Sequence, residues 1–136
     1  MSVTAKNANE QLALDFFAAL STGDLDNLRP FIDENSVWEP MVKDIPGAGC
    51  YRGNQIIDDF LGPVRGMFAP GDPKVFPQKI FSDGDHVCVE SYSLGKLRDG
   101  KQYDNRYCWT FLMNNGKIGL LREYMDSHYV ATLFGL

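Results

Sequence analysis

The sequence predicts an α+β fold in which helices come first and an antiparallel sheet follows. Apolar residues in the first half recur at helical spacing, whereas the second half consists of four long strand-like segments joined by turn signals. Helices and strands that are separated along the chain in this way pack as layers, with the helices on one face of the sheet. The 136 residues, 44% of them hydrophobic, suffice for one core, so we expect a single domain over residues 1–136.

Three helices are expected in the first half. Residues 7–20 place large apolar side chains at helical spacing. Residues 25–31 form a second, shorter helix with Asp24 as its N-cap. Residues 54–68 form the third, and we expect it to break near Pro63 because a proline removes a backbone donor.

One short strand and four long strands complete the predicted fold. The short strand, "SVWEP" (36–40), ends at a proline and leads into a loop rich in Gly and Pro. The turn signals "SDGD", "RDGK" and "NNGK" then separate the long strands. The long strands are "KVFPQKIF" (74–81), "HVCVESYSLGKL" (86–97), "QYDNRYCWTFLM" (102–113) and "GKIGLLREYMDSHYV" (116–130).

Composition disfavours several kinds of partner. The net charge of −5 argues against binding to nucleic acid or to an anionic membrane. No apolar run approaches the roughly 20 residues that cross a bilayer, and the polar N-terminal segment lacks a signal-peptide core. Three widely spaced cysteines without a C-x-x-C pair indicate reduced core thiols in a cytoplasmic protein. The two histidines lack metal-ligand spacing, so we expect neither a metal nor a cofactor.

The last strand carries a carboxyl group, Glu123, in an unexpected place. Side chains alternate along a strand, so Glu123 shares a face with Leu121 and Met125. Charged side chains are depleted from strands and are seldom fully buried without a partner. Two interpretations therefore remain open, namely an ion pair or strand-end charge that reaches water, and a half-buried carboxyl beside apolar groups.

The last two strands carry large apolar residues on both faces. Helices on one side of the sheet can cover only one of these faces. We therefore expect a second copy of the chain to cover the other face, which makes the protein a homodimer.

Several segments resemble the nuclear transport factor 2-like superfamily. "FFAALSTGDLDNLRPFIDENSVWEP" resembles its opening, and "YRG" followed by "QIIDDF" resembles its loop and third helix. "DGKQYDNRYCWTFLMNNGKIGLLREYMD" is similar to the SnoaL-like branch, which includes polyketide cyclases. "REYMDSHYVATLFGL" is similar to the end of the phenazine-biosynthesis A/B proteins. The resemblance implies a cone, in which a curved antiparallel sheet wraps over three helices around an internal pocket, and a dimer that binds a small hydrophobic organic ligand.

The resemblance also implies which residues form the pocket. Glu123 matches the position of a catalytic acid in related branches, and Glu39 lies near the general-base position of the ketosteroid isomerases. Two carboxyl groups in one dry pocket push their pKa values apart, which provides one acid and one base. Asn105 and Tyr107 would donate hydrogen bonds to a substrate oxygen, although core packing is the alternative for Tyr107. The other expected lining residues are Phe16, Trp38, Met67, Phe68, Trp109, Leu121 and Met125, and for Trp109 too the alternative is core packing.

Two departures from the related enzymes weaken specific activities. Ser91 and Ser93 stand where the epoxide-hydrolase branch carries an Arg-x-Asp pair, so the residues that would orient a water are missing. Phe16 stands where the isomerase branch carries a tyrosine that polarises the substrate carbonyl.

The expected function is therefore acid/base proton transfer, by isomerisation, cyclisation or dehydration, on a carbonyl-bearing or polycyclic substrate. The alternative is a non-catalytic ligand-binding dimer of the same fold. Two acids facing one cavity would favour the enzyme, and one acid paired with Arg65 or Arg106 would favour the binding protein. The C-terminal segment "SHYVATLFGL" would expose apolar side chains on a free tail, so we expect it to pack over the pocket mouth.

Overall fold

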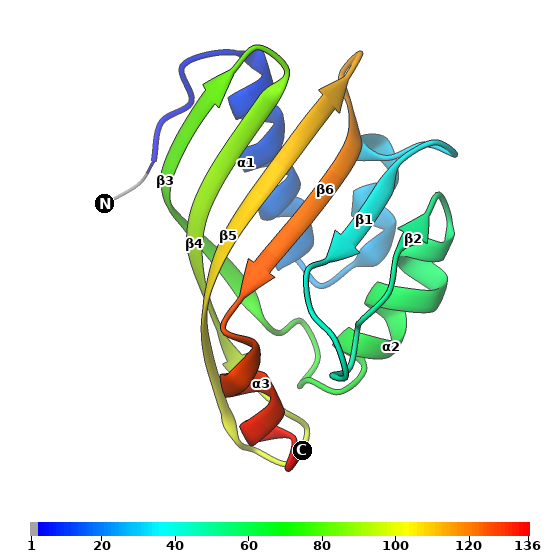
Figure 1. Ribbon diagram of the computed structural model, residues 1–136, viewed down its shortest axis with the longest axis vertical. Helices are drawn as coiled ribbons and strands as arrows, with labels where there is room; N and C mark the ends of the chain where they lie inside the picture. Colours follow the sequence, from blue (N-terminus) through cyan, green and yellow to red (C-terminus); the bar gives the residue numbers. More distant parts are fainter. Residues whose placement is uncertain (1–2) are drawn as a thin grey trace.

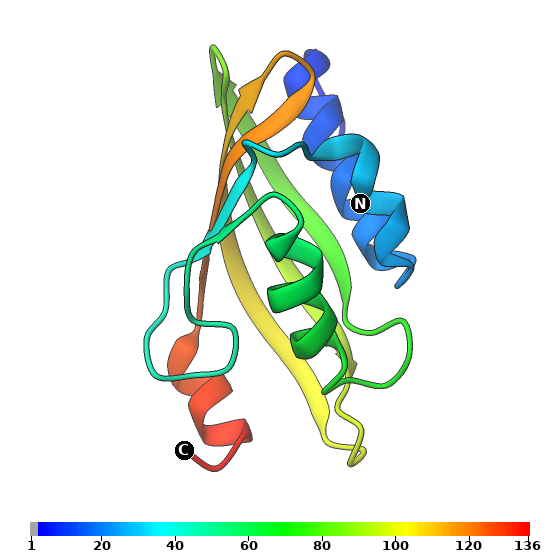
Figure 2. The ribbon, with the colours of Figure 1, turned by 90° about the vertical axis from the view of Figure 1, so that its right-hand side faces the viewer.

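A computed structural model describes residues 3–136 as a curved six-stranded sheet with helices on one face (Figures 1 and 2). The strand order across the sheet is β2-β1-β6-β5-β4-β3. The strands are β1 (Val37–Pro40), β2 (Tyr51–Arg52), β3 (Lys74–Asp83), β4 (His86–Lys96), β5 (Gln102–Asn114) and β6 (Lys117–Met125). The predicted α+β class and the four-strand antiparallel meander are confirmed.

The sheet differs from the prediction at its short edge. β1 runs parallel to β6, and the two-residue strand β2 pairs with β1 beyond it. Neither feature has a sequence signal, because a two-residue bridge is too short to show alternation and strand direction depends on the tertiary path. The parallel pairing matters for the site, since it places Pro40 of β1 beside Glu123 of β6.

The helices follow the predicted order. They are α1 (Ala8–Ser21), the 3₁₀ helix η1 (Leu25–Phe31), the π-helical segment η2 (Ile56–Leu61), α2 (Gly62–Arg65) and α3 (Ser127–Leu133). The expected break near Pro63 is a change of winding between η2 and α2, not an end of the helix. Proline is tolerated there because the first turn of a helix needs no N–H donor from it. Within residues 3–136, no helix is both long enough and apolar enough to span a bilayer.

Aromatic side chains fill the core between α1 and the sheet. Phe16 and Phe17 of α1 meet Trp38, Trp109 and Phe111 edge to face, with ring centroids 4.9–5.9 Å apart. Such contacts combine a large buried apolar area with favourable ring geometry. They fix α1 across the strands that carry the candidate site.

A buried carboxylate fastens the start of α1 to the edge strand β3. Glu10 is fully buried and accepts hydrogen bonds from the Ser82 hydroxyl, the Lys6 backbone N–H (3.0 Å) and the Asn7 side chain (3.3 Å). The Ser82 hydrogen bond contributes most to lowering the pKa of Glu10 below its ordinary value of 4.5. Glu10 is thus a structural carboxylate whose negative charge is stabilised by hydrogen bonds from the protein.

The convex face of the sheet carries no helix within residues 3–136 (Figure 2). Four large hydrophobic side chains on this face are 37–49% exposed, namely Phe76, Phe81, Leu112 and Tyr124. Cys88 and Cys108 also lie there, partly exposed, with their sulfur atoms 3.6 Å apart, so the expectation of core cysteines is wrong. The same alternation that points one set of side chains into the core places these on the outside.

We expect Glu10→Gln to lower the melting temperature at pH 7, because the new amide presents an N–H group to the donors that Glu10 accepts from. The difference in melting temperature between the wild type and Glu10→Gln should become smaller below pH 4.5. There, protonation of Glu10 removes the stabilisation that a carboxylate with a lowered pKa contributes. Asp15→Asn, on an exposed position of the same helix, is the matched control. Thermal denaturation that shows equal, small effects for both variants would contradict this role.

Candidate functional site

A cavity of about 80 Å³ lies between the concave face of the sheet and the helical segment η2–α2. A single buried water needs roughly 10–15 Å³ of such space, so the cavity has room for several water molecules or a compact ligand group. Its apolar lining includes Phe60, Leu61, Val64, Met67 and Phe68 from η2, α2 and the segment that follows. A mostly apolar cavity with a few polar groups is typical of small-molecule sites.

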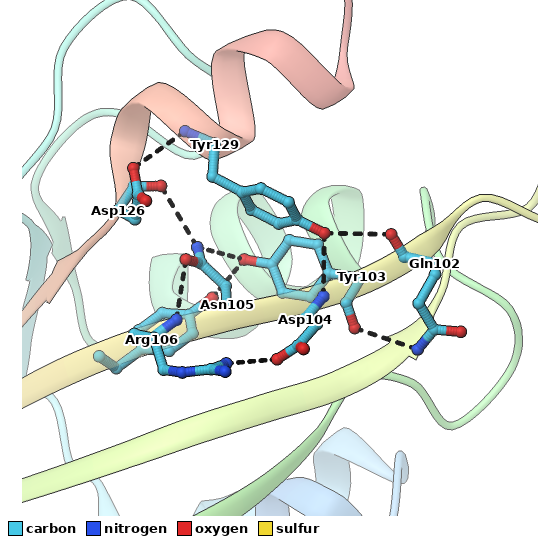
Figure 3. Close-up of polar contacts among 8 residues, drawn as sticks. Gln102, Tyr103, Asp104, Asn105, Arg106, Asp126 and Tyr129 are labelled. Atoms are coloured by element: carbon cyan, nitrogen blue, oxygen red, sulfur yellow. Dashed lines mark hydrogen bonds and ion pairs between the residues drawn. The ribbon is translucent and has the colours of Figure 1, made fainter.

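The C-terminal helix α3 closes one end of the cavity, as expected. Asp126 caps the helix by accepting a hydrogen bond from the Tyr129 backbone N–H (3.0 Å; Figure 3). Val130 of α3 and Phe134 just beyond it contribute side chains to the cavity wall. The helix thus seals the site instead of leaving a free apolar tail.

Glu123 of β6 points into this cavity. It stands opposite Trp109 in the β5–β6 register, and it is only 5% exposed. The only hydrogen-bond partner of its carboxyl group among residues 3–136 is the indole N–H of Trp38, at 2.9 Å. Burial raises the pKa of Glu123 from its ordinary 4.5 to about 7, and the Trp38 hydrogen bond opposes the increase. The carboxyl group is therefore suited to gain or lose a proton near neutral pH.

Two tyrosines and an asparagine form a hydrogen-bonded relay beside Glu123. The Asn105 amide donates to the Tyr103 hydroxyl (3.1 Å; Figure 3), which is in turn hydrogen-bonded to the Tyr107 hydroxyl. Either tyrosine hydroxyl can donate the hydrogen bond that joins them, because each is both a donor and an acceptor. When Tyr103 donates, the proton of Tyr107, which lines the cavity, is available to a ligand.

Burial keeps both phenols neutral. It raises the pKa of Tyr103 to about 12, and it raises the pKa of Tyr107 well above 10. The nearby Glu123 charge adds to both increases. Tyr107 also stacks on Trp109, with ring centroids 5.0 Å apart, which fixes the position of its hydroxyl group.

Most of the predicted site residues share this cavity. They are Glu123, Trp38, Met67, Phe68, Tyr107, Trp109 and Met125. Three other predicted site residues do not line the cavity. Phe16 and Leu121 are fully buried in the aromatic and aliphatic core, and the Asn105 amide is used internally. The strand and helix periodicities placed these three on the correct face, but the depth of the cavity depends on neighbouring side chains.

The prediction that Glu39 shares the pocket is wrong. Because side chains alternate along β1, Trp38 and Pro40 point inward, and Glu39 between them points outward opposite Arg122. Its carboxylate lies 3.3 Å from the Arg122 guanidinium, and both side chains are partly exposed. The cavity consequently contains one carboxyl group, Glu123, among the residues that the structure describes.

Three polar residues of the site were not predicted as ligand contacts. Tyr103, Ser93 and Arg65 all line the cavity. Tyr103 shares a strand face with Asn105 and Tyr107, so the same alternation would have found it. Ser91 is not one of them, because its hydroxyl accepts a hydrogen bond from the Trp109 indole (2.8 Å). Arg65 follows a proline-containing helical segment, and no periodicity signals its direction.

Within residues 3–136, no three His, Cys, Asp or Glu side chains come together in a way that would hold a metal ion. The polar groups that line the cavity are a carboxyl group, phenols, a serine hydroxyl and a guanidinium.

Comparison with known proteins identifies related sequences and folds. A model of the SnoaL-like domain matches residues 13–119. No curated protein matches the chain by sequence.

Similar structures cover nearly the whole chain. One is TerC co-crystallized with polyporic acid, at 17% identity over 96% of this chain and 100% of that chain, with a TM-score of 0.83. A putative SnoaL-like polyketide cyclase from Jannaschia sp. CCS1 is 16% identical over 96% of each chain, with a TM-score of 0.77. A protein with a ketosteroid isomerase-like fold from Catenulispora acidiphila DSM 44928, in complex with trimethylamine, is 15% identical over 93% of each chain, with a TM-score of 0.77. At these identities the likeness shows the fold alone.

We expect the stability of the protein to fall as the pH rises from about 4.5 to about 7. An acid whose pKa is higher in the folded state than in the unfolded state binds more protons when folded, so deprotonation costs stability across that window. The cost of ionising Glu123 is at most about 3 kcal/mol, since one pKa unit corresponds to about 1.4 kcal/mol.

Glu123→Gln should therefore unfold at higher denaturant concentration than the wild type at pH 8 and at a similar concentration at pH 5. Urea denaturation across this range measures the effect, with the exposed substitution Glu34→Gln as a control. If the urea midpoints of the wild type and Glu123→Gln changed equally with pH, the Glu123 carboxyl group would not be desolvated.

Proposed function

Because the chain belongs to the SnoaL-like domain family, we propose that it is an enzyme that moves a proton within a small carbonyl-bearing substrate, with Glu123 as the acid/base. The observation that carries this proposal is a single carboxyl group, buried in an apolar cavity with one hydrogen-bond donor. A structural carboxylate would have several donors, as Glu10 has.

The substrate binds in the cavity with its carbonyl oxygen near the Tyr107 hydroxyl. When Tyr103 donates its proton to Tyr107, the Tyr107 hydroxyl donates to that oxygen and stabilises the negative charge that develops there. The carbonyl is thereby polarised, which makes the protons on the neighbouring carbon more acidic. The phenol stays protonated throughout because burial raises its pKa.

Glu123 removes a proton from the carbon next to the carbonyl and returns it to another atom of the same molecule. One group that accepts and then donates one proton suffices for an isomerisation, or for a cyclisation in which the enolate carbon forms the new bond and Glu123 protonates the resulting oxygen. A pKa of about 7 leaves comparable amounts of acid and base near neutral pH. Dehydration fits less well, because expulsion of a hydroxyl group benefits from a second acid, and Glu39 lies outside the cavity.

The size of the cavity favours a compact substrate. A volume of about 80 Å³ accommodates a single ring with short substituents more readily than a polycyclic skeleton. A larger substrate would require displacement of wall residues such as Met67 or Phe134.

The proposal predicts proton exchange on monocyclic ketones, with 3-cyclohexenone as the first probe. In D₂O near neutral pH, NMR should show enzyme-dependent loss of the signals of protons next to the carbonyl. Glu123→Gln should slow this exchange about 10²–10⁴-fold, the usual share of general acid/base catalysis. Glu39→Gln, which removes a carboxylate outside the cavity, should retain wild-type exchange. Equal rates for the wild type and Glu123→Gln would refute the role of Glu123.

The alternative of a non-catalytic binding protein makes a different prediction for the same variants. Two acids in the cavity would have favoured the enzyme, and an acid paired with an arginine would have favoured the binding protein. Neither arrangement is present within residues 3–136, because Glu123 has no second acid beside it and forms no ion pair. A pure binding protein would take up the ketone without accelerating proton exchange. Saturable binding with no exchange would favour that alternative.

We also propose that the protein functions as a homodimer through the convex face of the sheet. Four partly exposed hydrophobic side chains gather on this face, and the helices occupy the other. A stable interface buries more than about 1,000 Å² in total, so the dimer contact would have to extend over several of the long strands.

Light scattering at micromolar concentration should therefore give the mass of a dimer. Phe81→Lys places a charge among the exposed apolar residues of β3, so it should shift the protein toward monomer. Leu136→Lys, at the exposed C-terminus, is the control. A monomer mass for the wild type would overturn the proposal.

A further inference from the structure

We propose that the end of the cavity away from Glu123 binds a carboxylate or similar anionic oxygen group of the substrate, through Arg65 and Ser93. The inference rests on the proposed function for the role of Glu123, but the anion subsite stands on separate residues and is tested separately.

Arg65 brings an unmatched positive charge to the cavity. It ends α2, is about half-buried and lines the cavity, yet it forms no ion pair with any carboxylate in residues 3–136. One of its N–H groups donates to the Pro73 carbonyl oxygen at 2.9 Å. A guanidinium has five N–H donors, so most of them remain available to a ligand.

The nearest acid does not neutralise this charge by direct contact. Burial lowers the pKa of Arg65, whereas the negative charge of Asp72 opposes the decrease, which places Asp72 in its vicinity. The Asp72 carboxylate, however, accepts a hydrogen bond from the Lys96 backbone N–H at 3.0 Å. The Asp72 charge therefore favours the charged form of Arg65 without forming an ion pair with it.

Ser93 supplies a second, independent indication of a ligand. Its side chain is only 1% exposed, and its hydroxyl has no hydrogen-bond partner among residues 3–136. No buried side-chain oxygen or nitrogen in those residues is sealed away without a partner, so the Ser93 hydroxyl must face the cavity that it lines. A buried hydroxyl is expected to be hydrogen-bonded, and here a ligand provides the missing partner.

The two groups lie at the same end of the cavity. Ser93 is paired with Val75 of β3, and the carbonyl that holds Arg65 belongs to Pro73, just before that strand. Glu123 is paired with Trp109, whereas Ser93 is paired with Asn105, four residues further along β5. The side chains of Ser93 and Glu123 therefore project from rows of the sheet that are four residues apart along β5.

Tyr107 lies between the two ends. It occupies the row of β5 between Asn105 and Trp109, and it influences the pKa of Arg65. The cavity thus has a cation and a hydroxyl at one end, a phenol in the middle and a neutral-to-anionic carboxyl at the other. A ligand that satisfies all three carries an anionic group at one end and an enolisable carbonyl nearer Glu123.

The test compares benzoate with benzamide, which have nearly the same shape but differ in charge. Calorimetric titration of the wild type should show saturable binding of benzoate that is stronger than that of benzamide. Arg65→Gln should weaken benzoate binding about 10–100-fold, the range expected for a lost hydrogen bond to a charged group, and leave benzamide nearly unchanged. Ser93→Ala should weaken benzoate binding several-fold.

Controls separate loss of the charge from loss of the fold. Arg29→Gln removes the same charge at an exposed ion pair with Asp26 and should leave benzoate binding intact. Arg65→Lys keeps the charge and should restore part of the preference for benzoate. Should Arg65→Gln fail to fold, as judged by circular dichroism, Arg65→Lys and Ser93→Ala carry the test, because wild-type benzoate affinity in both would overturn the anion subsite.

The anion subsite and the acid/base role fail in different ways. Absence of saturable benzoate binding, equal binding of benzoate and benzamide, or unchanged benzoate affinity in folded Arg65→Gln overturns the subsite and leaves proton exchange by Glu123 untouched. Conversely, Glu123→Gln should retain the benzoate preference. Wild-type proton exchange in Glu123→Gln together with that preference would overturn the acid/base role and support the subsite.

Discussion

The site depends on one constraint, a carboxyl group that is held in an apolar cavity with a single donor. The protein contains two buried glutamates, Glu10 and Glu123, whose surroundings differ. Glu10 is equally buried, but several donors surround it, and its pKa is lowered. Among residues 3–136, the Glu123 carboxyl group accepts a hydrogen bond only from the Trp38 indole, and burial raises its pKa to about 7. Two glutamate side chains thus have different roles: Glu10 is a structural anchor at one end of the sheet, and Glu123 is a titratable group elsewhere in the sheet.

The rest of the fold maintains that environment. Aromatic contacts between α1 and the sheet fix Trp38 and Trp109, which flank the carboxyl group. The helix α3 closes the end of the cavity, and its cap at Asp126 adjoins the relay through the Asn105 amide (3.4 Å). Each of these elements excludes water or orients a donor, and a low local dielectric strengthens both the phenol hydrogen bond and the effect of burial.

Much of this arrangement was predictable from the sequence, because strand alternation is a local property. It placed Glu123, Tyr107, Trp109 and Met125 on one face, and the structure brings all four to the cavity. Glu39 was misplaced because it is adjacent to Trp38 in β1, so strand alternation allows only one of the two to face the cavity, and that one is Trp38. Arg65 and Ser93 were missed as ligand contacts because their importance lies in the partners that they lack, and a missing partner is visible only in three dimensions.

The central claim is that the Glu123 carboxyl group is desolvated, and a direct titration tests it. Protein labelled with ¹³C at the glutamate side-chain carboxyl carbons would be titrated by NMR, with Glu123→Gln used to assign the signal. The account predicts a midpoint near pH 7 for Glu123. A midpoint near the ordinary value of 4.5 would show that the carboxyl group is solvated, and it would contradict the account.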